Sequence, residues 1–129
     1  MKTYELLAGR ILLAQIFLMA GISKLGAGYG GTQAYMESMG VPGILLPAVI
    51  ALELLGGIAL VTGWFTRHIA WALAIFSVVA AVLFHANFSA QIQTILFMKN
   101  LALAGGLLVL ASLGAGTISL DHRFRAQEA

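Results

Sequence analysis

The stretch ILLPAVIALELLGGIALVTGW, from Ile44 to Trp64, decides the fold of this chain. It is long enough to cross a bilayer, because a hydrocarbon core of roughly 30 Å needs about 20 apolar residues at about 1.5 Å each. One acid, Glu53, lies near its middle. An ionisable group at that depth costs on the order of 3 kcal/mol, so it must be neutral, paired or wetted by a cavity. Glu53 is therefore the first candidate for a functional residue.

The composition of the whole chain agrees with a membrane location. Of the 129 residues, 60% are hydrophobic and 9% are charged, whereas an ordinary soluble domain is about 25% charged. The mean hydropathy is +0.96. A soluble domain of this size could not bury so much apolar surface. We therefore expect an all-α, polytopic membrane protein.

Several kinds of chemistry are excluded by residues that the sequence lacks. It has no cysteine, which excludes disulfide, thiolate and Cys-ligated metal chemistry carried by this chain alone. His85 has no second His or Cys at ligand spacing, so we predict no metal site. The net charge of +2 comes from few residues. Because no basic run is long enough to bind nucleic acid, we predict no such partner.

Three more apolar stretches have the length of a membrane span, which predicts a single four-span domain over residues 1–129. A polar loop, Asn87 to Thr94, separates the last two spans, and a polar, basic tail occupies residues 117–129. This organisation predicts an integral membrane four-helix bundle. The predicted spans cover residues 6–25, 44–64, 68–86 and 95–114.

The first span admits an alternative interpretation as a signal peptide, because Lys2 and the run from Ile11 to Ala20 mimic its charged and apolar regions. The interruption by Arg10, the absence of a clear A-x-A site and the three following spans favour a retained helix. Arg10 is expected to snorkel to the near interface, because helical side chains lean toward the helix N-terminus.

The loop between the first two spans is expected to hold a short helix at the membrane interface. Thr32 is a plausible N-cap and Gly40 a plausible C′ residue, while Pro42 prevents the helix from continuing. These signals predict a helix from Gln33 to Met39, with tyrosines on either side of its start at the depth that suits them.

Glycines and other small residues indicate where the spans pack closely. Ala70 with Ala74, and Ser77 with Ala81, form small-xxx-small pairs in the third span. A double glycine occurs in the second helix of each predicted hairpin, which is a sign of a duplicated two-helix unit. The glycines expected at helix contacts are Gly56, Gly57, Gly105 and Gly106.

The cations predict the orientation. An even number of spans puts both termini on one side, and that side carries most of the basic residues. The positive-inside rule then places both termini in the cytoplasm and the interfacial helix outside. The basic residues on the cytoplasmic side are Lys2, Arg67, Arg123 and Arg125, with Arg10 near them.

A pocket open to the outer half of the membrane is the functional hypothesis. Glu53 would form its floor, and the predicted helix starts put Lys99 roughly 8 Å away in depth, so that a direct contact needs a helical offset or a bridging water. The alternative is that Glu53 is neutral and hydrogen-bonded to a neighbouring helix, while the cations are interfacial anchors. The candidate ligand-binding or proton-relay residues are Glu53, His85, Lys99, Asn100 and Lys24.

An ordered set of motifs resembles the DoxX family of small bacterial inner-membrane proteins. The resemblance covers nearly the whole chain and implies a four-helix membrane bundle similar in fold to vitamin K epoxide reductase, without the cysteine pair on which that enzyme depends. It also implies an association with membrane redox complexes. The motifs are GTQAYMESMGVPG at residues 31–43, E-x-x-G-G at 53–57, Gly63 with Arg67, FHANF at 84–88 and MKNLALAGG at 98–106.

Three functions from different classes remain open at this point. The first is a redox-linked subunit that binds quinone between helices, with Lys99 or His85 donating to a quinone oxygen and Glu53 relaying a proton. The second is a structural or assembly partner of other membrane subunits or of a second copy. The third is a small-molecule transporter. Membrane lipid is a partner in all three.

Overall fold

The computed structural model describes residues 2–128 and contains helices but no strand in that range. The expectation of an all-α chain is confirmed. The helices are α1 (Lys2–Ser23), α2 (Ala27–Ser38), α3 (Leu46–Thr62), α4 (Thr66–Phe84), α5 (Gln91–Leu113) and α6 (Leu120–Glu128), and a 3₁₀ turn, η1 (Gly43–Leu45), leads into α3.

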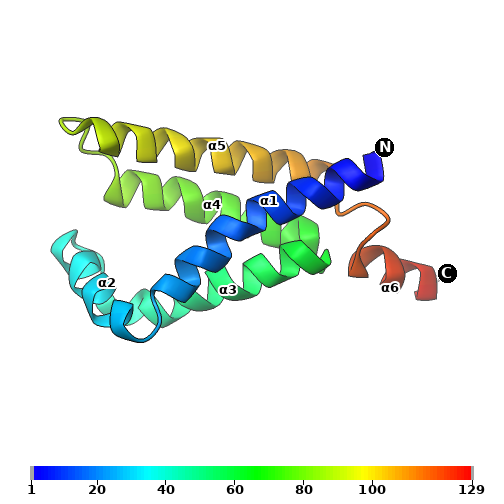
Figure 1. The fold of residues 1–129 in the computed structure, drawn as a ribbon, viewed down its shortest axis with the longest axis horizontal. Coiled ribbons are helices and arrows are strands. Elements are labelled where there is room, and N and C mark those ends of the chain that lie inside the picture. Colours follow the sequence, from blue (N-terminus) through cyan, green and yellow to red (C-terminus); the bar gives the residue numbers. More distant parts are fainter. Residues whose placement is uncertain (1, 129) are drawn as a thin grey trace.

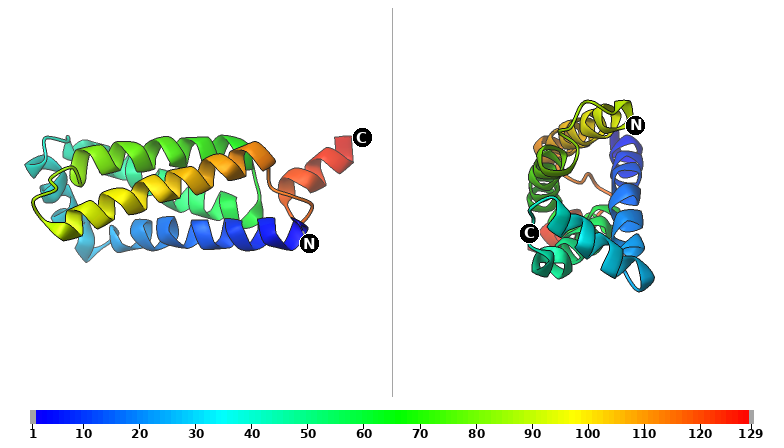
Figure 2. Two further views of the ribbon diagram at one scale, coloured as in Figure 1. Left: turned by 90° about the horizontal axis from the view of Figure 1, so that it is seen from above. Right: turned by 90° about the vertical axis from the view of Figure 1, so that its left-hand side faces the viewer.

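Four helices, α1, α3 with η1, α4 and α5, are long and apolar enough to cross a membrane, as predicted. They run side by side along one axis (Figure 2). The two ends of the chain lie at one end of the bundle, here called the terminal end, and α2 lies across the opposite end, here called the α2 end (Figure 1). The most extensive contacts pair α1 with α3 and α4 with α5, and α3 contacts α4 between the two pairs.

The core of the bundle is built from leucines and small residues. Leu60, Leu73 and Leu107 are fully buried, and alanines from α1, α4 and α5 pack around them. Large apolar side chains also cover the outside, such as Met19 and Val109, which are 67% and 60% exposed. Helices that are apolar all round are expected where the surroundings are hydrocarbon and not water.

Three of the four predicted packing glycines lie at helix contacts. A Cβ on Gly56 would lie 3.2 Å from Leu73 of α4, one on Gly57 would lie 2.6 Å from Leu18 of α1, and one on Gly106 would lie 3.3 Å from Leu13 of α1. Gly105 differs, because it is exposed and nothing lies within 4 Å of its Cβ position. The prediction for Gly105 is wrong within this chain, since one residue along a helix is a turn of about 100° and carries it to the outer face.

The interfacial helix exists but begins earlier than predicted. Thr32 is not its N-cap, because α2 starts at Ala27 and the Thr32 hydroxyl donates to the Gly28 carbonyl at 2.9 Å. The early turn is held by packing, since Tyr29 contacts the buried cluster formed by Met36, Leu46 and Ile50. Gly40 follows the helix with φ of 81°, the left-handed conformation expected of a C′ glycine.

Arg10 does not snorkel. It is fully buried, and its guanidinium donates to the carbonyls of Leu60, at 3.3 Å, and Ile118. The chain after α5 folds back over the terminal end and brings the Ile118 carbonyl to the guanidinium. Interior carbonyls therefore accept from both terminal nitrogens of Arg10, which removes the need to reach the interface, while its buried Nε has no partner among the described residues.

The residues after α5 also cap the start of α4. The carboxylate of Asp121 accepts from the backbone N–H groups of Phe65, at 2.7 Å, and Thr66, at 2.9 Å. In return, the N–H of Asp121 donates to the carbonyl of Gly63 at 2.9 Å. No side chain of the α3–α4 turn caps α4. The carboxylate satisfies two free donors and complements the helix dipole, so the segment predicted as a polar tail forms part of the bundle.

Gly63→Ala should destabilise the protein, and Gly105→Ala should not. Gly63 has φ of 73°, and a Cβ there would collide with Arg10 and Ser119, whereas a Cβ on Gly105 meets nothing within 4 Å. Strain of this kind costs about 1 to 3 kcal/mol, while alanine in an open helical position stabilises by up to about 1 kcal/mol. Thermal unfolding in mild detergent measures both. Equal melting temperatures for the two variants would contradict this packing of the terminal end.

Candidate functional site

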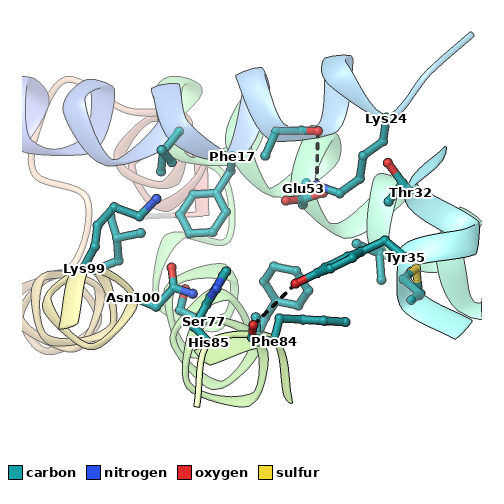
Figure 3. Close-up of a pocket in the computed structure, with 17 residues that line it drawn as sticks. Phe17, Lys24, Thr32, Tyr35, Glu53, Ser77, Phe84, His85, Lys99 and Asn100 are labelled. Atoms are coloured by element: carbon teal, nitrogen blue, oxygen red, sulfur yellow. Dashed lines mark hydrogen bonds and ion pairs between the residues drawn. The ribbon is translucent and has the colours of Figure 1, made fainter. Parts of the chain in front are cut away.

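A cavity of about 310 Å³ lies among the spans near the α2 end (Figure 3). Every helix from α1 to α5 contributes to its wall. The structure brings all five predicted site residues to this one cavity. They are Lys24, Glu53, His85, Lys99 and Asn100.

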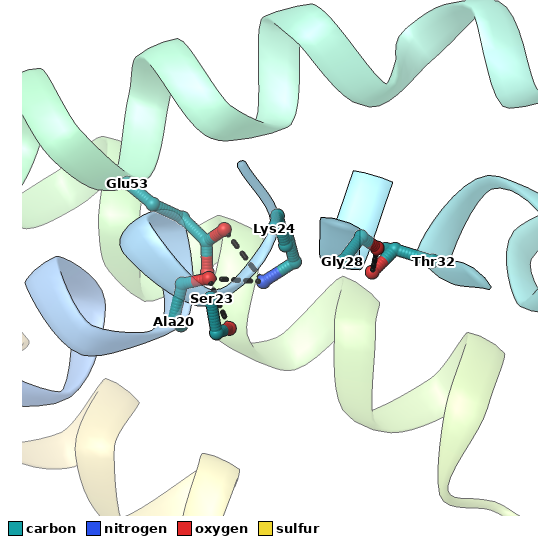
Figure 4. A network of polar contacts seen from close by, with 6 residues as sticks. All are labelled: Ala20, Ser23, Lys24, Gly28, Thr32 and Glu53. Atoms are coloured by element: carbon teal, nitrogen blue, oxygen red, sulfur yellow. Dashed lines mark hydrogen bonds and ion pairs between the residues drawn. The ribbon is translucent and has the colours of Figure 1, made fainter. Parts of the chain in front are cut away.

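Lys24 is the ion-pair partner of Glu53. Their Nζ and Oε1 atoms are 2.8 Å apart, and the two side chains are 21% and 5% exposed. The contact has the distance of an ion pair but not the angles of a hydrogen bond. Nζ also donates to the carbonyl of Ala20 at 3.2 Å, in the last turn of α1 (Figure 4). Lys24 therefore turns inward to Glu53 and does not act as an interfacial anchor.

Gly21 makes this pairing possible. A Cβ at Gly21 would lie 2.7 Å from Leu54 and 3.4 Å from the Cβ of Glu53. The missing side chain lets α1 and α3 approach closely one residue from the acid. Gly21 was not predicted as a site residue. The signal that could have found it is a glycine inside an apolar span, three residues before a lysine.

Lys99 lies deeper than the sequence predicted. Because α5 begins at Gln91 and not at Ile95, Lys99 is about 12 Å along its helix, against about 11 Å for Glu53 measured from Leu46. The expected offset of about 8 Å came from starting α5 too late. Lys99 lies across the cavity from Glu53 (Figure 3). No acid whose side chain the structure describes forms an ion pair with Lys99.

His85 is oriented by Gln93, which lies in the stretch predicted to be a polar loop. Its Nδ1 lies 2.8 Å from Oε1 of Gln93, in the first turn of α5. Since an amide oxygen only accepts hydrogen bonds, Nδ1 carries the proton in this contact. If the ring carries only this proton, the other ring nitrogen, Nε2, is an acceptor that is not used by Gln93.

The helix α2 covers the cavity with Tyr35, one of the two tyrosines predicted to lie at the membrane interface. The Tyr35 hydroxyl donates to the carbonyl of Phe84 at 3.4 Å, and the two rings stack with centroids 5.6 Å apart (Figure 3). Phe17 and Phe76 also line the cavity. The result is an apolar, aromatic chamber that has charged or polar groups on opposite sides.

This arrangement suits a small lipophilic molecule with polar ends. Lys99 and Asn100 can donate hydrogen bonds to such a molecule. His85 can accept a hydrogen bond from it, and Glu53 can exchange a proton with it. Among the side chains that the structure describes there is no group of three or more His, Asp or Glu that could hold a metal ion. Small-molecule sites are commonly found between the helices of a bundle.

Comparison with known proteins places the chain in a family. The family model for DoxX matches residues 5–86, which include Lys24, Glu53 and His85. The chain therefore belongs to the DoxX family, as its motifs predicted.

Individual relatives cover most of the chain. It is 48% identical over 116 residues to the inner membrane protein YqjF of Escherichia coli (strain K12), covering 90% of this chain and 88% of YqjF. It is 38% identical over 125 residues to the inner membrane protein YphA of the same organism, covering 92% and 89%. CatD of Bacillus subtilis (strain 168), whose name provisionally calls it an oxidoreductase, is 29% identical over 109 residues, covering 80% and 81%. No solved structure matches.

Lys24→Met should destabilise the protein far more than Lys99→Met, although both remove a cation from the same cavity. Breaking a buried pair by removing one partner costs roughly 3 to 5 kcal/mol, and we expect about 2 kcal/mol here because Lys24 is partly exposed. Adding Glu53→Gln to Lys24→Met should restore most of the loss. Unfolding in detergent is measured for the wild type, the three single variants Lys24→Met, Glu53→Gln and Lys99→Met, and the double variant. Additive effects of Lys24→Met and Glu53→Gln would rule out the pair as a stabilising contact.

Proposed function

We propose that this chain is a four-span subunit of a redox-linked complex in the bacterial inner membrane, and that it binds quinone in the cavity at the α2 end. The observation that carries the proposal is the placement of polar groups on opposite sides of an aromatic chamber. Glu53 and Lys24 lie on one side, and Lys99 lies on the other (Figure 3).

The cavity matches the shape of a quinone head group. A quinone is a flat apolar ring with an oxygen on each of two opposite edges. The volume of about 310 Å³ is at the lower end of the range for small-molecule sites, about 300 to 1,000 Å³. A head group fits that space, and its isoprenoid tail would extend into lipid. Lys99 or Asn100 would donate to one oxygen, and the Lys24 ammonium to the other.

Glu53 and His85 supply the proton chemistry. Reduction of a quinone to a quinol consumes two electrons and two protons, and we assign the electrons to a partner redox subunit. Glu53 is paired with an ammonium group, so its carboxylate can accept a proton and pass it on. His85 holds its Nδ1 proton against Gln93 and presents Nε2 as an acceptor for a quinol hydroxyl.

Relatives and charge distribution support the assignment. CatD, at 29% identity, carries an oxidoreductase name, and YqjF and YphA are named inner membrane proteins. The positive-inside rule places the terminal end, with Lys2, Arg67 and Arg125, in the cytoplasm. The cavity then belongs to the outer half of the membrane.

A second candidate function, an assembly subunit without its own chemistry, is favoured by two glycines that meet no neighbour within this chain. Gly9 of α1 and Gly105 of α5 have open space at their Cβ positions. These two helices contact each other much less than either contacts its paired helix. Small residues on an open face allow a helix of another subunit, or of a second copy, to approach closely.

Quinone should bind the wild-type protein and bind at least tenfold more weakly to Glu53→Gln and Lys99→Met. Loss of either polar side of the chamber removes a hydrogen-bonding or charge contact worth about 1.5 to 3 kcal/mol. Glu5→Gln and Lys2→Met are matched controls, because both residues lie in the first turns of α1, away from the cavity. A quinone difference spectrum in detergent, with lipid extraction of the purified protein, measures binding. Equal binding by all five proteins, or none by the wild type, would contradict the proposal.

A further inference from the structure

A second and larger cavity, of about 580 Å³, lies at the terminal end, beside the α3–α4 turn and α6. Figure 1 shows α6 next to this turn, at the end of the bundle opposite α2. A smaller cavity of about 280 Å³ adjoins it and shares Arg67 and Arg125. None of these residues lines the cavity proposed for quinone.

The charge in this cavity is positive. Arg67 and Arg125 have no ion-pair partner among the side chains that the structure describes. Among the described side chains, Asp121 is the one acid lining either cavity, and its two oxygens accept from the N–H groups of Phe65 and Thr66. Gly114 leaves room for the Arg67 guanidinium, since a Cβ there would lie 3.2 Å from its Nε. The cavity therefore contains two arginines and one carboxylate whose oxygens are already hydrogen-bonded.

A buried hydroxyl in the same cavity lacks a partner. Thr66, the first residue of α4, lines the cavity and is 0% exposed, and its Oγ1 makes no hydrogen bond. A buried polar group without a partner costs about 1 to 3 kcal/mol. An oxygen-rich ligand in the cavity would satisfy this hydroxyl after a small side-chain movement and would be neutralised by the arginines.

The position of the cavity points to lipid as the source of that ligand. Trp64 and Phe65 line it, are 48% and 54% exposed, and follow directly on the end of the α3 span. Aromatic side chains in such positions lie at head-group level. Basic pockets at the ends of transmembrane helices bind acidic lipid head groups.

We propose that this cavity binds the phosphate of an anionic phospholipid of the phosphatidylglycerol type. Arg67 and Arg125 hold the phosphate oxygens, since the planar guanidinium fork suits phosphate. The Thr66 hydroxyl donates to the head group. The acyl chains lie along the apolar outer faces of the adjacent spans, where Trp71 and Ile75 of α4 are exposed.

Native mass spectrometry of the full chain in mild detergent tests this, with phosphatidylglycerol, phosphatidylcholine or inorganic phosphate added. We expect the wild type to retain phosphatidylglycerol at least tenfold more strongly than phosphatidylcholine. Arg67→Gln and Arg125→Gln should each remove that preference. Arg123→Gln is the matched control, because Arg123 lies on the same short helix but lines neither cavity. It should behave as the wild type.

Thr66→Val separates binding from folding. The variant should bind phosphatidylglycerol more weakly, yet its melting temperature without added lipid should not fall, because the change removes a hydroxyl that has no partner. Equal retention of both lipids by the wild type would overturn the proposal, as would an effect of Arg123→Gln as large as that of Arg67→Gln. Binding of inorganic phosphate with no selectivity between the lipids would overturn the assignment to lipid.

Discussion

The ion pair between Glu53 and Lys24 is the contact on which the α2 half of the structure depends. A carboxylate within an apolar span needs a partner, and the ammonium at the end of α1 supplies one at 2.8 Å. Gly21 lets the two helices approach closely enough for this contact. Because the chain turns into α2 only a few residues after Lys24, the pair also fixes where α2 crosses the bundle. The aromatic chamber is the space left between that crossing helix and the spans.

The polar groups of the bundle are of two kinds. At the terminal end, Arg10 donates hydrogen bonds to the carbonyls of Leu60 and Ile118. Asp121 accepts from the N–H groups of Phe65 and Thr66. These contacts hold the segment after α5 against α3 and the α3–α4 turn. At the α2 end, Lys99 and Nε2 of His85 point at a cavity and have no described partner there. Polar groups that are satisfied internally serve stability, whereas unsatisfied ones beside a cavity are available to a ligand.

The four spans followed from length and hydropathy, and their order along the chain put Glu53, Lys24, His85, Lys99 and Asn100 toward the same end of the bundle. The depth of Lys99 did not follow, because α5 begins earlier than its apolar run. The rotation of the helices did not, because spans that are apolar all round carry no periodic signal of which face points inward. Gly105 was misplaced for that reason. Arg10 and Asp121 were missed because their partners lie 108 and 56 residues away. The starts of α2 at Ala27 and of α5 at Gln91 have no side-chain cap hydrogen bond, so local capping signals do not reveal them.

The central claim is that Glu53 is a carboxylate paired with Lys24 inside the membrane. Infrared difference spectroscopy of the wild type against Glu53→Gln, in lipid at neutral pH, tests it most directly, with Lys24→Met as the second sample. The account predicts that Glu53→Gln removes a carboxylate band and no protonated-carboxyl band, and that Lys24→Met shifts or abolishes the same carboxylate band. A protonated-carboxyl band in the wild type that disappears in Glu53→Gln and is unchanged in Lys24→Met would contradict it.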